Sequence, residues 1–178
     1  DAGWIALHTA IAGGAEICLL PEIPFSLEKV LKKIHKRYHK GRGFVNIVIA
    51  EGAKPEGGEV IGRQALDERD EHIKLGGVGN YLRRQLEDNG CPAQVRTTIL
   101  GHIQRGGTPV AFDRILATAM GMKAFEMVQD GDFGQMVSYH NHHLEQVPLE
   151  EAVKENKYVS PDHYLVKVAR ATGISFGD

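Results

Sequence analysis

An imidazole and a guanidinium lie close together in the glycine-rich segment GHIQRGGTP, as His102 and Arg105. A β-branched run over 95–99 precedes the segment and an apolar periodic stretch over 110–128 follows it, which predicts a strand, a tight turn and a helix in this order. Both side chains then lie in the turn, where the strand end and the helix start can face one ligand. The pattern indicates an anion site, with phosphate favoured. An ordinary turn in which Arg105 pairs with a nearby carboxylate is the alternative.

The start of that helix has clear signals. The Thr108 hydroxyl can accept a hydrogen bond from a backbone N–H as the N-cap of the helix. Pro109 suits the first helical position, because the N–H that proline lacks is not needed for a hydrogen bond there. Gly106 and Gly107 allow the backbone to pass close to a bound group. We therefore expect the helix N-terminus to contribute to the anion site.

Glu51 directly follows the strongest strand pattern in the chain, the nearly continuous apolar run 44–50. Such a run is typical of a central parallel strand that is covered on both faces. Ligands of open parallel sheets bind at the carboxyl ends of the strands, where a carboxylate can accept hydrogen bonds from sugar hydroxyls or bind a metal. The alternative is that Glu51 caps the next turn or pairs with a lysine.

Arg96 lies inside the predicted strand 95–100, which is otherwise apolar or threonine. A guanidinium is seldom fully buried in a sheet without a partner. We expect Arg96 either to form a plain salt bridge near an edge or to reach an anion across an interface.

Two further patterns favour structural interpretations. The glycine-rich stretch 75–80 opens a helix but lacks the dinucleotide fingerprint, so we interpret it as a flexible helix entry. His140, His142 and His143 fall on a predicted hairpin turn, and a solvated turn is favoured over a metal site because zinc sites usually show clearer paired spacing.

The composition is that of an ordinary soluble domain: of the 178 residues, 42% are hydrophobic and 25% charged. A net charge of −2 gives no electrostatic reason to expect nucleic acid or a membrane surface as partner, and no apolar run is long enough to span a bilayer. Cys18 and Cys91 show no pairing pattern and are expected to stay reduced, as in the cytoplasm.

The hydrophobic periodicity predicts strands alternating with helices, hence an α/β fold with three layers, in which helices cover both faces of a mostly parallel sheet. Residues 52–76 form a long polar insertion, for which we expect a surface loop or a small hairpin. Lysines and arginines crowd the later turns of the helix that begins after Ser26, and a solvated face is favoured for them. Expected helices cover about 2–12, 26–38, 78–88, 110–128 and 160–171, a short one covers 149–153, and expected strands cover 16–20, 44–50, 95–100, 135–140 and 144–147.

The chain begins with Asp1 rather than methionine, and the apolar period is already running at Trp4. We expect a larger protein cut inside a structural unit.

The glycine-rich segment and its surroundings resemble 6-phosphofructokinases, over roughly residues 1–128. The resemblance implies that 1–178 is the C-terminal, sugar-phosphate-binding part of such an enzyme, with 129–178 packing back on an N-terminal part that the chain lacks. The matching segments are LGHIQRGGTP, FDRILA, AGGAE, PE and VIAEG.

The resemblance also implies roles for single residues. His102 and Arg105 match positions that bind the 6-phosphate of fructose 6-phosphate, and Glu51 matches the carboxylate that binds sugar hydroxyls. Arg96 matches an arginine that reaches the 6-phosphate in a neighbouring subunit. Glu16 matches an effector-site position of bacterial members, although only Arg42 partly reproduces the basic residues expected there.

Several parts of the family pattern are absent from the sequence. The phosphate-donor loop and the aspartate that deprotonates the sugar hydroxyl do not occur, and the arginine of the MGR motif would lie immediately before Asp1. We therefore expect no catalytic residue in this chain and no activity of the chain alone. The insertion resembles a subgroup with both ATP-dependent and pyrophosphate-dependent members.

The implied reaction is glycolytic phosphoryl transfer to the 1-hydroxyl of fructose 6-phosphate, giving fructose 1,6-bisphosphate. ATP is the favoured donor and pyrophosphate the alternative, with Mg²⁺ bound mainly by the absent part. The resemblance further implies a cytoplasmic homodimer or homotetramer. A non-catalytic sugar-phosphate-binding domain is the alternative from another functional class.

Overall fold

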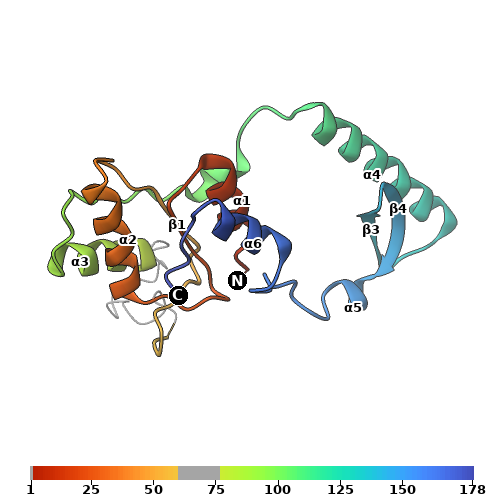
Figure 1. Ribbon diagram of the computed structural model, residues 1–178. Helices are drawn as coiled ribbons and strands as arrows, with labels where there is room; N and C mark the ends of the chain where they lie inside the picture. Colours follow the sequence, from red (N-terminus) through yellow and green to blue (C-terminus); the bar gives the residue numbers. More distant parts are fainter. Residues whose placement is uncertain (1, 60–76) are drawn as a thin grey trace, which may run out of the picture. The chain divides into compact units, whose positions relative to one another are not determined.

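The computed structural model describes residues 2–59 and 77–178 (Figure 1). The chain divides into two compact units, which are described separately. Unit 1 comprises Asp1–Gly101 and Lys157–Asp178, and unit 2 comprises His102–Asn156. Unit 1 contains α1 (Trp4–Gly13), β1 (Ile17–Leu19), α2 (Leu27–His39), β2 (Ile47–Ile49), α3 (Gly77–Asp88) and α6 (Tyr164–Ala171).

The sheet of unit 1 is built around β1. β1 pairs in parallel with β2, with Leu19 opposite Ile49, and a parallel bridge joins Ile17 to Ser175 on the other side. Two backbone hydrogen bonds support that bridge, from Cys18 N to Ser175 O (2.9 Å) and from Ser175 N to Glu16 O (3.0 Å). β1 is therefore the central strand, and all three of its residues are buried.

Helices cover both faces of this sheet because successive β1 side chains point in opposite directions. Cys18 packs into a cluster with α1 and α6, whereas Ile17 and Leu19 pack into a second cluster with α2 and α3. Figure 1 shows α1 beside α6 and α2 beside α3. The predicted three-layer α/β class is thus confirmed.

The predicted central strand differs from the observed one. Of the run 44–50 only Ile47–Ile49 is strand, and these residues are half-buried. The predicted strand 95–100 has extended residues but no strand pairing. Val95 still packs against the second cluster while Arg96 is exposed, so the side chains alternate without a hydrogen-bonded partner. β2 therefore pairs on one edge only among the described residues, which explains why its three residues remain half-buried.

Several predicted helices are confirmed in unit 1. α1 ends at Gly14, which adopts the left-handed conformation (φ 64°) that terminates many helices. α2 begins after Ser26, whose backbone is extended as at an N-cap. The last helix begins at Tyr164 with His163 as its cap, because the Ser160 carbonyl and hydroxyl accept bonds from His163 N and Asp162 N and form a preceding turn.

Most of the predicted insertion lies outside the described residues, namely 60–76. Its described beginning is less exposed than a surface loop, since Ala53 is fully buried and Phe25 N donates to Lys54 O at 3.0 Å. Part of the glycine-rich stretch, residues 75 and 76, also lies outside, while Gly77 opens α3.

Unit 2 consists of a long helix and a hairpin. Its elements are the 3₁₀ helix η1 (Gly101–Arg105, which begins at the last residue of unit 1), α4 (Ala111–Asp130), β3 (Gln135–His140), β4 (His143–Pro148) and α5 (Leu149–Ala152). The predicted antiparallel hairpin is confirmed. Asn141 (φ 46°) and His142 (φ 66°) form its two-residue turn with positive φ at both positions, as tight hairpins require.

The prediction that α4 begins at Pro109 with Thr108 as its N-cap is wrong. The helix begins at Ala111 with Val110 as its N-cap, and the Asp113 carboxylate accepts a bond from Val110 N at 2.9 Å. The capping carboxylate comes from inside the helix, so the helix starts after Pro109 rather than at it.

Unit 2 has almost no core of its own. Met127 is its only buried residue among those described. Large apolar side chains of α4 are 58–69% exposed: Phe112, Ile115, Met122, Phe125 and Val128.

Candidate functional site

Glu51 lies where the sequence predicts it, at the carboxyl end of a parallel strand. It follows β2 in a turn, its side chain is exposed, and no described residue forms a hydrogen bond or ion pair with it. The alternative in which Glu51 pairs with a lysine is therefore not seen among the described residues. Its carboxylate is open to a hydroxyl or cationic ligand.

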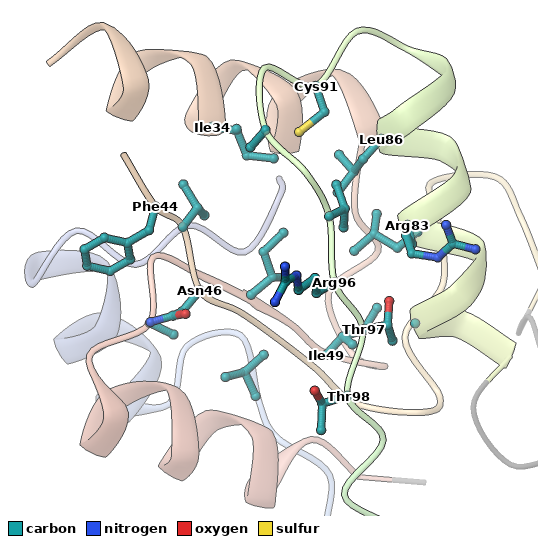
Figure 2. A pocket seen from close by; sticks show the side chains of 18 of the residues that line it. Ile34, Phe44, Asn46, Ile49, Arg83, Leu86, Cys91, Arg96, Thr97 and Thr98 are labelled. Atoms are coloured by element: carbon teal, nitrogen blue, oxygen red, sulfur yellow. The ribbon is translucent and has the colours of Figure 1, made fainter. Parts of the chain in front are cut away.

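Arg96 lines the larger cavity of unit 1, whose volume is about 590 Å³ (Figure 2). The cavity lies along β2 and the extended segment 93–98, between side chains of α2 and α3. Figure 2 shows polar groups from several elements around it, among them Asn46, Arg83, Arg96, Thr97 and Thr98. Apolar side chains such as Ile34 and Leu86 complete the wall. Glu51 does not line this cavity.

The two arginines of the cavity differ in their partners. Arg83 is neutralised by Glu87, with Nη1 and Oε2 2.7 Å apart. Arg96 makes only a long bond to the amide oxygen of Gln94 (3.3 Å) and pairs with no described carboxylate. The plain salt bridge, one of the two alternatives for Arg96, is thus not formed among the described residues, and the charge of Arg96 is available to an anion.

His102 and Arg105 lie on η1, both exposed and without a described hydrogen-bond or ion-pair partner. The predicted tight turn is a 3₁₀ helix, and residues 106–110 separate it from α4. Because Asp113 accepts the bond from Val110 N, a carboxylate already occupies the start of α4. The helix N-terminus is consequently a poorer anion ligand than the sequence suggests.

The four predicted site residues fall into two groups. Glu51 and Arg96 belong to unit 1, whereas His102 and Arg105 belong to unit 2. Within unit 1, the side chains of Glu51 and Arg96 are not brought into one cavity.

Glu16 is the only buried charged residue among those described, with 7% exposure. One carboxylate oxygen pairs with Arg37 Nη2 at 2.5 Å, and the other accepts a bond from Asn46 N at 2.6 Å. Arg37 also donates from Nε to Phe44 O at 3.1 Å. Both carboxylate oxygens of Glu16 therefore have a partner, and one of these partners is the Arg37 guanidinium.

Arg37 borders a basic hollow of about 250 Å³ that the sequence did not predict. Its lining consists of Lys33, Lys36, Arg37, Lys40 and Arg42. Burial, followed by the neighbouring Lys36 and Arg37, lowers the pKa of Lys33 below its usual value. The helical spacing of these cations was visible in the sequence, but the return of Arg42 beside them depends on the turn after α2.

Neither the Cys18 thiol nor the histidines of the hairpin have the surroundings of a nucleophile or a metal site. Burial, with a smaller effect of Glu22, raises the pKa of the Cys18 thiol to about 12, so this cysteine is a poor nucleophile. In the described part of the chain, no three metal-binding side chains come together, and the hairpin histidines are no exception. Nδ1 of His142 instead lies 3.1 Å from the hydroxyl oxygen of Tyr139.

None of the described helices combines the length and apolar character required to cross a membrane.

The layered parallel α/β architecture with polar groups at strand ends defines a class of ligand-binding and catalytic proteins. Residues 1–128 match the family described as phosphofructokinase. The chain belongs to the phosphofructokinase family.

Individual relatives match along nearly the whole chain. ATP-dependent 6-phosphofructokinase 2 of Clostridium perfringens is 43% identical over 178 residues, which are 100% of this chain and 49% of that protein. Pyrophosphate–fructose 6-phosphate 1-phosphotransferase of Amycolatopsis methanolica is 45% identical over 163 residues, which are 92% of this chain and 47% of that protein. The chain therefore spans about half the length of these curated relatives.

Solved structures support the same fold. Phosphofructokinase from Saccharomyces cerevisiae aligns with a TM-score of 0.64 and 29% sequence identity, covering 96% of this chain and 20% of that chain. The Pichia pastoris phosphofructokinase in the T-state gives a TM-score of 0.64 at 27% identity, with 96% and 17% coverage.

Proposed function

We propose that this chain is the sugar-phosphate-binding half of a 6-phosphofructokinase, an enzyme that phosphorylates the 1-hydroxyl of fructose 6-phosphate. The observation that carries the proposal is the similarity along the entire chain to the Clostridium perfringens enzyme, which includes the segment around His102 and Arg105. We place the protein in the cytoplasm, in keeping with glycolysis and with the two free cysteines.

His102 and Arg105 bind the 6-phosphate in this proposal. Both are exposed and unpaired among the described residues, and a guanidinium with an imidazole can donate several charge-assisted bonds to phosphate oxygens. Glu51 accepts hydrogen bonds from sugar hydroxyls, for which its unpaired carboxylate suits it. Arg96 reaches the 6-phosphate of a neighbouring subunit, which requires a homodimer or homotetramer.

Phosphoryl transfer depends mainly on positioning and charge stabilisation. The four side chains orient the acceptor so that its 1-hydroxyl faces the donor, and the base that takes the hydroxyl proton lies outside this chain. Mg²⁺ accompanies the donor in the proposal. We assign the ligands of this metal mainly to the half that the chain does not span.

ATP is the donor we favour, because the Clostridium perfringens relative carries that donor in its name. Pyrophosphate is the alternative, supported by the Amycolatopsis methanolica relative at comparable identity.

Unit 2 completes a domain with the half that the chain does not span. Residues 129–156, with the hairpin, pack back on that half, and the exposed apolar side chains of α4 are covered in the same way. Residues 157–178, which we also expected to pack there, belong instead to unit 1, where α6 lies in the core cluster with α1. Support comes from the nearly coreless unit 2 and from the relatives, which are about twice as long. Such a large uncovered apolar face is unusual for a soluble domain.

An effector role for Glu16 takes an indirect form in this proposal. Glu16 orients Arg37, and the five cations of the basic hollow bind an anionic effector. Both oxygens of Glu16 already have a partner, so in this proposal the cations and not Glu16 contact the effector.

A coupled assay of the complete polypeptide tests the proposed activity. Formation of fructose 1,6-bisphosphate is measured with fructose 6-phosphate, Mg²⁺ and either ATP or pyrophosphate. Product with ATP supports the favoured reaction, and product with pyrophosphate alone moves the protein to the alternative. Binding of fructose 6-phosphate without product from either donor would instead identify the non-catalytic sugar-phosphate-binding domain.

A further inference from the structure

A single carboxylate, Glu22, joins two segments that are distant in the sequence. Its Oε1 accepts a hydrogen bond from Gly3 N at 3.0 Å and another from Val159 N at 2.9 Å. Gly3 precedes the first residue of α1, and Val159 lies before α6. Glu22 therefore fixes the start of one helix against the approach to another.

Trp4 and His163 reinforce this junction. Trp4 Nε1 donates to Lys157 O at 2.7 Å, and the Trp4 ring meets the His163 ring edge to face with centroids 4.9 Å apart. His163 in turn caps α6, accepting from Leu165 N at 3.3 Å. We call Glu22, Trp4 and His163 the α1 clamp.

The clamp leaves no room at Gly3. A Cβ at this position would lie 2.7 Å from Glu22 Oε2 and 2.8 Å from Leu20 Cδ2, both far inside normal contact distance. Oε2 is buried and has no hydrogen-bond partner in the part of the chain that the structure describes, so Glu22 contacts these backbone donors through Oε1. The position of the first turn of α1 is consequently set by close packing as well as by hydrogen bonds.

The register of the sheet places this clamp at the edge that carries Glu51. Glu22 follows the carboxyl end of β1, and Glu51 follows the carboxyl end of β2. The two strands are parallel with Leu19 opposite Ile49, so both carboxyl ends lie at the same sheet edge. The bond from Gly3 N to Glu22 brings the N-terminus of α1 to that edge as well.

We propose that Glu22 is a positioning residue for the sugar-phosphate pocket. Together with Trp4 and His163 it fixes the N-terminus of α1 at the sheet edge beside Glu51, and thereby the backbone that borders the sugar. Glu22 does not touch the substrate. The inference rests on the proposed function, because it assigns the sheet edge to the sugar.

The test uses the complete enzyme and compares kinetic constants for fructose 6-phosphate. Glu22→Ala removes both hydrogen bonds, and Gly3→Ala displaces the same turn while the carboxylate remains. Both variants should raise KM for fructose 6-phosphate about tenfold, because small displacements of positioning groups have large kinetic effects. The kcat should stay within about twofold of the parent, as should KM for the donor.

Two controls separate positioning from general stability. Gly13→Ala changes the other end of α1, where a Cβ meets nothing within 4 Å, and should leave KM unchanged. Glu22→Gln retains a carbonyl oxygen that accepts both backbone bonds, and its KM should lie within about twofold of the parent. Trp4 lies in the clamp, so the tryptophan fluorescence of Glu22→Ala should differ from that of the parent, whereas that of Glu22→Gln should not.

Unchanged KM in both Glu22→Ala and Gly3→Ala, with only a lower melting temperature, would overturn the inference and leave Glu22 a structural residue. A Glu22→Gln variant as impaired as Glu22→Ala would also contradict it. If Glu22→Ala does not fold, Gly3→Ala and Glu22→Gln decide the question. A parent enzyme without activity on fructose 6-phosphate refutes the proposed function itself, which is a distinguishable failure.

Discussion

Charged side chains in this chain divide into those neutralised within the fold and those left open to a ligand. Glu16 with Arg37 and Asp178 with Arg170 belong to the first kind. The second kind includes Glu51 and Arg105, for which the described chain supplies no partner. The proposed function assigns the second kind to substrate recognition.

The ion pair between Arg170 and Asp178 predicts a pH-dependent stability. The hydrogen bond from Arg170, strengthened by its charge, holds the pKa of Asp178 below the usual value of 3.8. The stabilisation is therefore present above about pH 4 and is lost as the pH falls through the lowered pKa. Asp178→Asn should reduce the free energy of unfolding at pH 7 by about 1 kcal/mol or less, because both side chains are partly exposed.

Urea unfolding at pH 7 and pH 2 measures this difference. Asp178→Asn and the parent should differ at pH 7 and converge at pH 2, whereas Asp88→Asn on the exposed end of α3 should behave like the parent at both. A difference that persists at pH 2 would speak against the ion pair as its source. Arg170 is left unchanged because it also lies over the Phe176 ring, 4.9 Å from its centroid.

At the scale of elements, local patterns predicted most helices and the hairpin. Terminating glycines, apolar periodicity and the tight turn at Asn141 are determined by neighbouring residues, so they are readable from the sequence. Strand pairing is not local. The β-branched run 95–100 has the composition of a strand, yet it makes no strand pairs in the structure, and the Asp113 cap moved the start of α4 past Pro109.

In the candidate site, too, local features could be predicted from the sequence and long-range contacts could not. The residue types of Glu51, Arg96, His102 and Arg105 suggested their chemistry directly. The contacts of Glu22 could not be predicted, because Glu22 and Val159 are 137 positions apart in the sequence. The pairing of Glu16 with Arg37 could not be predicted either, because it depends on how α2 packs beside the sheet.

The exposed apolar side of α4 gives a prediction at this scale. Phe125→Glu in the present chain should change the free energy of unfolding by no more than about 0.5 kcal/mol, since the side chain is 58% exposed. In the complete polypeptide the same change should cost about 3 kcal/mol or more, because it would bury an unpaired charge.

Chemical denaturation of both polypeptides measures the two costs. Ile5→Glu, at an α1 side chain of unit 1 that is 67% exposed, serves as the control and should have a small effect in both. Equal and small costs for Phe125→Glu in the two polypeptides would show that the complement does not cover α4.

At the scale of the whole molecule, the chain combines a layered unit with its own core and a second unit that buries almost nothing. The first contains Glu51, Arg96 and the α1 clamp, and the second contains His102 and Arg105. The curated relatives are about twice as long as this chain. In the proposed function we assign recognition of the sugar phosphate to this chain and the donor side to the half that it does not span.

The KM of the complete enzyme for fructose 6-phosphate, measured for Arg105→Ala beside the parent, tests this assignment most directly. Loss of one charge-assisted phosphate contact is worth about 1.5–3 kcal/mol, which corresponds to an increase of KM by roughly ten- to a hundredfold. Arg84→Ala removes an exposed arginine of α3 and should leave KM unchanged. An Arg105→Ala enzyme with the parent's KM for fructose 6-phosphate would contradict the account.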